Sequence, residues 1–120
     1  MTTLLVAMAG AAGAVLRYRI GVAVGVRAFP WATLGINLAG CFLLATLLAG
    51  PAQSRWGPAA TTAVGIGLLG SFTTFSTFGY ETFTLLRTER VGAAAAYAAA
   101  SLVGGLAATA AGYLTGRALA

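Results

Sequence analysis

The chain has 120 residues, of which 59% are hydrophobic and only 8% are charged, and its mean hydropathy is +0.90. Soluble domains carry about 25% charged residues, so this composition excludes a soluble protein and predicts an all-α membrane protein. The formal net charge of +5 comes from scattered arginines and not from a basic cluster, which excludes nucleic acid as a partner.

Four apolar segments predict four membrane-spanning helices, joined by short connections into one transmembrane domain over residues 1–120. Trp31 and Trp56 fall at the expected membrane interfaces, where indole rings collect. The chain is therefore expected to be a multi-pass membrane protein in contact with lipid. The expected spans cover about residues 2–26, 31–49, 58–86 and 91–119.

The first two spans each contain a polar residue that needs a partner within the membrane. Arg17 lies deep in the first span, where it can snorkel to the interface, bind lipid phosphate or attract anions to a vestibule. Asn37 is the only asparagine in the chain and lies in the middle of the second span. Its amide either bonds another helix or donates to an anion, and the sequence leaves both interpretations open.

The third span is too long and too polar to be one continuous lipid-facing helix. As a helix it would be about 43 Å long, whereas the hydrocarbon core is about 30 Å thick. Between Gly70 and Phe78, serine and threonine hydroxyls alternate with phenylalanines. Hydroxyls compete with helical backbone bonds, and irregular backbone at membrane depth survives only inside protein or beside a cavity. We therefore predict a break between Gly70 and Ser76, where something polar binds or passes.

Three residues of the third span are candidates for a polar pathway. Phe75 and Phe78 share a helix face, and ring edges with partial positive charge would form a constriction that tolerates anions. Glu81 follows one turn later, and an intramembrane carboxylate is a functional candidate. The alternative is an interfacial carboxylate that pairs with an arginine or accepts a hydrogen bond from a hydroxyl.

The fourth span carries a stripe with a period of four residues, formed by Tyr97, Ser101, Gly105 and Thr109. Residues four apart share one face of a helix, so the stripe predicts a track of hydroxyl groups. The alternative is that Ser101 and Thr109 bond only to carbonyls of their own helix.

A second stripe of the fourth span consists of small residues, Gly104, Ala108, Gly112 and Gly116. Such ridges let helix backbones approach closely in lipid. Four short spans hardly enclose a polar pathway alone, so we expect a dimer with two-fold symmetry. The arginines are nearly balanced between the two sides of the membrane, which leaves the orientation open and is compatible with antiparallel pairing.

The sequence offers no chemistry for an enzyme. It contains no histidine, so neither a nucleophile–base pair nor a cluster of metal-binding side chains can be assembled. One function class that would fit four spans is a small proton-coupled multidrug exporter. That function needs a carboxylate in the first span, and the first span here has no acidic residue.

Three motifs resemble the Fluc (CrcB-type) fluoride channels, and the resemblance covers nearly the full chain. The motifs are GAVLRY at 13–18, TLGINLAG at 33–40 and GLLGSFTTFSTF at 67–78, the last followed by Glu81. The resemblance implies an antiparallel, dual-topology dimer in a prokaryotic plasma membrane, with two separate fluoride pathways. It also implies passive efflux that keeps cytoplasmic fluoride low.

The same resemblance implies roles for individual residues. It places Asn37, Phe75, Phe78, Ser101 and Thr109 in the fluoride pathway, Tyr97 and Glu81 beside it, and Arg17 near the vestibule.

The resemblance further implies a structural sodium ion, which is not transported, bound at the dimer centre by the backbone carbonyls of Gly70 and Thr73. Gly105 departs from the family, because relatives often carry a further hydroxyl there. The expected partner is a second copy of the chain, although some relatives pair with a paralogous chain instead.

Overall fold

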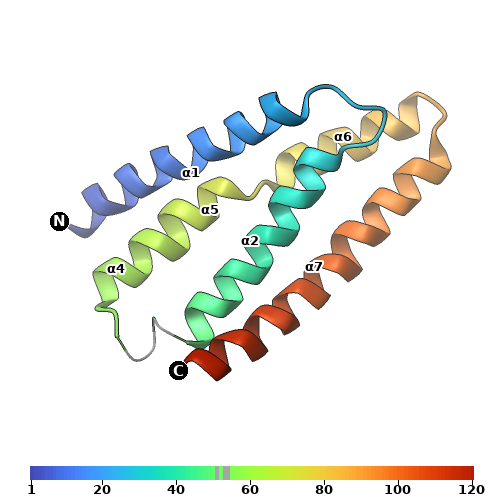
Figure 1. Ribbon diagram of the computed structural model, residues 1–120. Helices are drawn as coiled ribbons and strands as arrows, with labels where there is room; N and C mark the ends of the chain where they lie inside the picture. Colours follow the sequence, from blue (N-terminus) through green and yellow to red (C-terminus); the bar gives the residue numbers. More distant parts are fainter. Residues whose placement is uncertain (51, 53–54) are drawn as a thin grey trace.

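The structure, a computed structural model, describes residues 1–50, 52 and 55–120, and every regular element within them is a helix. Four helical segments are long and apolar enough to cross a membrane: α1 (Thr2–Val24), α2 (Trp31–Ala49), a broken third helix (Pro58–Arg87) and α7 (Val91–Leu119). The prediction of an all-α protein with four spans is confirmed. Both termini lie at one end of the bundle, and the α1–α2 and α6–α7 connections lie at the other (Figure 1).

The third helix consists of four pieces: α4 (Pro58–Thr62), the π-helix η1 (Ala63–Leu69), α5 (Gly70–Phe72) and α6 (Phe75–Arg87). Between α5 and α6 the backbone is extended at Thr73 (φ −78°, ψ 158°) and Thr74 (φ −152°, ψ 115°). The predicted break is therefore present, and it is confined to two residues. The π-helix was not predicted.

Threonine hydroxyls stabilise both sides of the break. Thr73 Oγ1 donates to the Leu69 carbonyl at 3.0 Å, so this side chain ends α5 by bonding its own helix. Thr74 is the N-cap of α6, because its Oγ1 accepts from the Thr77 backbone N–H at 3.3 Å. The hydroxyls of the third span thus explain locally why the helix stops and restarts.

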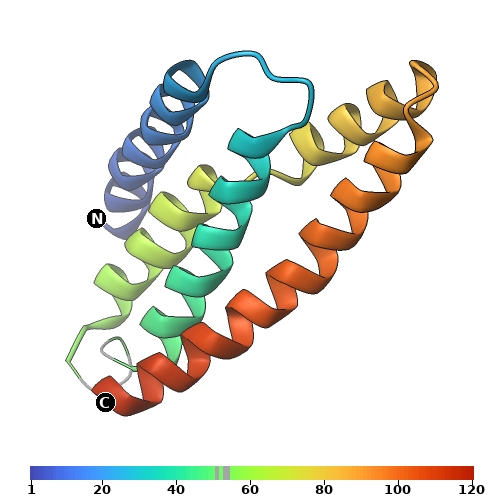
Figure 2. The same cartoon turned by 45° about the vertical axis from the view of Figure 1, so that its right-hand side comes forward.

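The helices associate mainly as two pairs, α1 with η1 and α5, and α2 with α7 (Figures 1 and 2). Glycines permit both contacts. A side chain on Gly13 would overlap the Leu68 carbonyl, and one on Gly112 would overlap the Phe42 carbonyl. This approach also lets Thr46 Oγ1 donate to the Gly112 carbonyl at 3.1 Å. The small-residue ridge of α7 therefore mediates close packing as expected, but within one protomer.

Large apolar side chains cover the outside of the bundle, as expected for a surface in lipid. The interior at the end near α6 contains a cluster of Leu34, Leu85, Ala94 and Tyr97. Tyr97 is completely buried, so the one large side chain at the centre of this cluster carries a hydroxyl that needs a partner.

Candidate functional site

A cavity of about 280 Å³ lies beside the break in the third helix. Its walls come from α2, α7 and the two helical pieces that meet at the break. It brings together residues that the sequence analysis selected from three different spans. The cavity is lined by Asn37, Phe75, Phe78 and Ser101 together with the candidate sodium positions Gly70 and Thr73.

Asn37 connects α2 to the extended backbone of the break. Its Nδ2 donates to the Thr74 carbonyl at 3.0 Å, and its Oδ1 accepts from the Thr74 N–H at 2.8 Å. The side chain thus supplies two backbone bonds that a continuous helix would supply itself. Asn37 therefore bonds the backbone of another span, as one of its two interpretations predicts. Within the described part of the chain Nδ2 makes only this one bond, so its second N–H is available to a ligand in the cavity.

Ser101 presents a buried hydroxyl to the same cavity. Within residues 1–50, 52 and 55–120, its Oγ is the only buried side-chain polar atom without a hydrogen-bond partner. By contrast, Thr109 Oγ1 donates to the Gly105 carbonyl of its own helix at 2.9 Å, and Thr109 is exposed outside the cavity. Because buried polar groups are nearly always bonded, the Ser101 hydroxyl indicates a place for a polar ligand.

Aromatic rings form a continuous row from the protein interior to the cavity. The ring centroids of Tyr97 and Phe78 are 5.2 Å apart, and those of Phe78 and Phe75 are 5.6 Å apart with an interplanar angle of 46°. Phe78 is partly buried, whereas Phe75 is 79% exposed at the outer end of the row. The tilted rings turn some of their edges toward neighbouring groups, which suits contact with negative charge.

Glu81 lies one turn beyond Phe78 and is bonded by two hydroxyls from different helices. Thr33 Oγ1 donates to Oε1 at 2.9 Å, and the Tyr97 hydroxyl donates to Oε2 at 2.7 Å. The structure therefore agrees with the hydroxyl-acceptor interpretation of this carboxylate. Thr33 is not among the residues predicted from the sequence, although it lies one helical turn before Asn37 on the same face of α2 and is buried.

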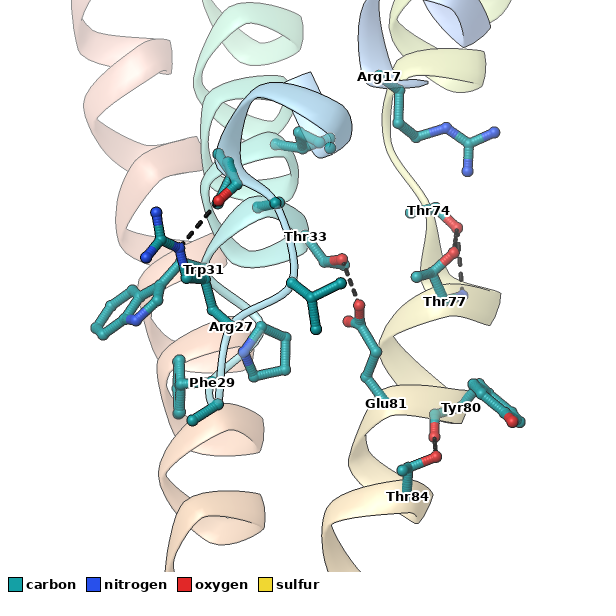
Figure 3. Close-up of a pocket in the computed structure, with 18 of the residues that line it drawn as sticks. Arg17, Arg27, Phe29, Trp31, Thr33, Thr74, Thr77, Tyr80, Glu81 and Thr84 are labelled. Atoms are coloured by element: carbon teal, nitrogen blue, oxygen red, sulfur yellow. Dashed lines mark hydrogen bonds between the residues drawn. The ribbon is translucent and has the colours of Figure 1, made fainter. Parts of the chain in front are cut away.

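A wider groove of about 1080 Å³ lies between α1, the α1–α2 connection and α6 (Figure 3). Arg17 extends from α1 near the start of α6, and Glu81 and Thr33 reach toward each other across the groove. Arg27 and Arg90 also line it, and Arg90 donates to the Ala28 carbonyl. The arginines outnumber the single carboxylate, so the groove attracts anions.

The groove and the smaller cavity share one lining residue, Thr74. Arg17 and Glu81 therefore belong to the wide groove, whereas Asn37 and Ser101 belong to the narrow cavity beyond it. Thr74, in the extended backbone of the break, therefore borders both spaces.

Residues 4–113 match the protein family described as "CrcB-like protein, Camphor Resistance (CrcB)". The chain belongs to this family. It is 45% identical over 117 residues to "Fluoride-specific ion channel FluC 2" of Geobacillus kaustophilus, covering 94% of this chain and 91% of the relative. It is 42% identical over 119 residues to "Fluoride-specific ion channel FluC" of Thermus thermophilus, covering 97% and 95%. A Bacillus cereus "Fluoride-specific ion channel FluC 1" is 44% identical over 117 residues.

The break in this CrcB-family chain places the backbone carbonyls of Gly70 and Thr73 outside the regular bonding of a continuous helix. The Thr74 N–H, which would bond the Gly70 carbonyl in a continuous α-helix, bonds Asn37 instead. The carbonyls of Gly70 and Thr73 thus lie at an interrupted helix, where unwound backbone coordinates sodium in other membrane proteins. No cluster of three His, Cys, Asp or Glu side chains occurs in the described residues, so the available ligands there are neutral oxygens.

The different surroundings of Ser101 and Thr109 predict different effects of removing their hydroxyls. We expect Ser101→Ala to lower anion flux through reconstituted protein by about tenfold, since a hydrogen bond to a charged partner contributes about 1.5–3 kcal/mol. We expect Thr109→Val to stay within about twofold of the parent chain, as for other surface substitutions. Equal losses in the two variants, measured with an ion-selective electrode, would contradict this assignment.

Proposed function

We propose that this CrcB-family chain is a fluoride-selective channel that mediates passive efflux of fluoride and lowers its cytoplasmic concentration. The observation that carries the proposal is the cavity at the break, where Asn37, the unpartnered Ser101 hydroxyl and two phenylalanine rings converge. The names of the relatives, which are fluoride-specific ion channels, support the same function. They are also the reason to assign the chain to ion transport and not to catalysis.

The donors in the cavity suit a small, strongly hydrated anion. Moving a bare carboxylate-sized ion into an apolar medium costs on the order of 20 kcal/mol, and fluoride is smaller. A path must replace this hydration with several weak sites, because a single deep site would hold the ion. An amide N–H, a neutral hydroxyl and ring edges are such weak donors. Guanidinium groups lie in the wide groove instead, where Arg17 would concentrate anions before they enter.

The groove and the cavity define a candidate route for the ion. Fluoride would enter the groove, pass Glu81 and then Arg17, and reach the break at Thr74. It would then exchange between Asn37, the ring edges of Phe78 and the hydroxyl of Ser101. The groups that would contact it are neutral along this inner part, which favours rapid release.

The alternative function, a small proton-coupled multidrug exporter, is not supported. The relatives are named as fluoride-specific channels, and α1 contains no carboxylate that would exchange protons for cationic drugs.

The functional unit we propose is an antiparallel homodimer. Phe75 is 79% exposed at the mouth of the cavity, and Gly70 is also exposed. In a single protomer the narrow part of the route is therefore open on one side, and a second copy would close it. Two-fold symmetry would give two routes and bring the two breaks together. A paralogous partner chain would satisfy the same geometry, so the purified chain has to be tested alone.

Sodium is proposed as a structural ion between the two breaks. The carbonyls of Gly70 and Thr73 from both copies would hold it, and the ion would neutralise the negative ends of the interrupted helices. Its contribution would be cohesion between protomers, since both ligands are backbone carbonyls, which neither react nor titrate.

The proposed function is tested by fluoride efflux from liposomes that contain only this chain. We expect release of fluoride, detected by a fluoride electrode, and no release of chloride from matched vesicles. Efflux of both halides would disprove selectivity. Absence of fluoride release from protein that elutes as a dimer would disprove the function itself.

Phe78→Ile tests the aromatic row. The substitution keeps an apolar side chain of similar bulk but removes the ring edge, so we expect fluoride efflux to fall by about tenfold, the upper range for an aromatic contact of 0.5–1.5 kcal/mol. Assembly should be unchanged, as judged by size-exclusion chromatography. Parent-like efflux from a correctly assembled variant would remove Phe78 from the pathway.

Removal of sodium tests the carbonyl site independently of conduction. We expect the unfolding temperature of the detergent-solubilised protein to fall when sodium is replaced by N-methylglucamine. The shift should be roughly 5 °C for each kcal/mol of sodium binding. Potassium serves as the control for ionic strength. The same unfolding temperature in all three salts would exclude a structural sodium.

A further inference from the structure

The strongest further feature of the molecule is a polar stripe on α2 that faces the hydroxyl stripe of α7. Thr33, Asn37 and Cys41 are spaced by one turn and therefore share one face of α2. Their partners follow the same order along α7. Thr33 and Tyr97 both bond Glu81, Asn37 and Ser101 line the narrow cavity together, and Cys41 lies opposite Gly105.

Opposite Cys41, the third residue of the polar stripe on α2, α7 contributes no side chain. Gly105 is buried, and a Cβ added to it would lie 3.7 Å from Cys41 Sγ, an ordinary van der Waals distance. The thiol of Cys41 therefore borders the space that a side chain at position 105 would occupy. Cys41 also lines the narrow cavity, where the buried Ser101 hydroxyl lacks a partner.

We propose that Cys41 supplies the third polar group of the fluoride route, in place of the side chain that Gly105 lacks. The inference rests on the proposed function and extends it to a residue outside the recognised motifs. A thiol is a weak donor and a polarizable contact, which suits a site that must not retain the ion. Asn37, Ser101 and Cys41 would then form consecutive contacts along the boundary between α2 and α7.

The sharpest test moves the hydrogen-bond donor from position 41 on α2 to position 105 on α7. We expect Cys41→Ala to lower fluoride efflux by about threefold to tenfold, because a donor to a charged group is lost. Adding Gly105→Ser to that variant should restore efflux to within about twofold, since the hydroxyl would enter the same space from α7. The double variant with Gly105→Ala is the matched control, because it adds the Cβ without the hydroxyl, and it should not restore efflux.

Modification of the thiol gives an independent readout, because Cys41 is the only cysteine in the chain. Methyl methanethiosulfonate is small and neutral. The Cys41 thiolate would attack its sulfenyl sulfur, forming a methyl disulfide and releasing methanesulfinate. We expect this added methylthio group to lower efflux from the parent protein at least about tenfold by narrowing the route, with the Cys41→Ala variant unaffected.

The outcomes separate the inference from the function on which it rests. If the parent chain releases no fluoride, the proposed function fails. If the parent chain conducts but Cys41→Ala releases fluoride at the parent rate, or Gly105→Ala rescues as well as Gly105→Ser, only the role of Cys41 fails. A thiol that mass spectrometry finds modified without loss of efflux would also overturn it. So would a thiol that reacts only after denaturation, because a group on the route has to be reached from water.

Discussion

Asn37→Asp is expected to abolish fluoride efflux, reducing it by at least roughly 100-fold, because a carboxylate near the middle of a span costs about 3 kcal/mol. Aspartate retains the oxygen that accepts from the Thr74 N–H. It loses the N–H that donates to the Thr74 carbonyl and places a negative oxygen against that carbonyl. The same negative charge would repel an anion in the cavity. Efflux from liposomes, normalised to the amount of dimer, measures the effect.

Asn37→Leu separates the two contributions of the amide. It introduces no charge but removes both bonds to Thr74, so it should reduce efflux and also lower thermal stability, whereas Asn37→Asp keeps one of the bonds. Thr115→Val is a suitable control, because Thr115 is exposed and bonds only the Ala111 carbonyl of its own helix. Parent-like efflux from Asn37→Asp would exclude Asn37 as an anion contact.

Gly112→Ala is expected to lower the stability of the protein strongly. The new Cβ would overlap the carbonyl group of Phe42, which is backbone and can yield only if α2 and α7 separate. Overpacking of this kind typically costs about 1–3 kcal/mol, and separation would also stretch the bond from Thr46 to the Gly112 carbonyl. Thermal unfolding followed by circular dichroism in detergent, together with the yield of monodisperse protein, measures the loss.

Gly105→Ala is the matched control for this substitution. Gly105 lies on the same helix and is also buried, but a Cβ there would meet only Cys41 Sγ at 3.7 Å. We expect its unfolding temperature to match that of the parent chain. If Gly112→Ala is as stable as Gly105→Ala, the close approach of α2 and α7 does not require glycine.

The four spans and the break could be predicted because each follows from a local requirement. Long apolar runs have to be helical in lipid, and clustered hydroxyls at membrane depth favour a break in the helix. Asn37, Phe78 and Ser101 could be selected for similar reasons, since each is unusual at its depth in a span. Their convergence on one cavity agrees with that selection.

Other features depend on contacts between distant segments and could not be predicted. The pairing of Asn37 with the Thr74 backbone requires α2 to lie beside the break. The hydrogen bond from Thr33 to Glu81 likewise joins α2 to α6, and no local sequence pattern predicts it. The π-helix Ala63–Leu69 also lacks a sequence signal, because its residues would fit an ordinary helix equally well.

The pairing of α2 with α7 has a consequence for how the protein is made. These two helices run in the same direction, and the whole third span is synthesised between them. Because α2 precedes α7 in the chain, α2 is synthesised before its main neighbour. The Asn37 amide can bond Thr74 only after the third span has also been synthesised. A chain that stopped before α7 would keep the bonds between Asn37 and Thr74 but would expose the face of α2 that α7 covers in the complete bundle.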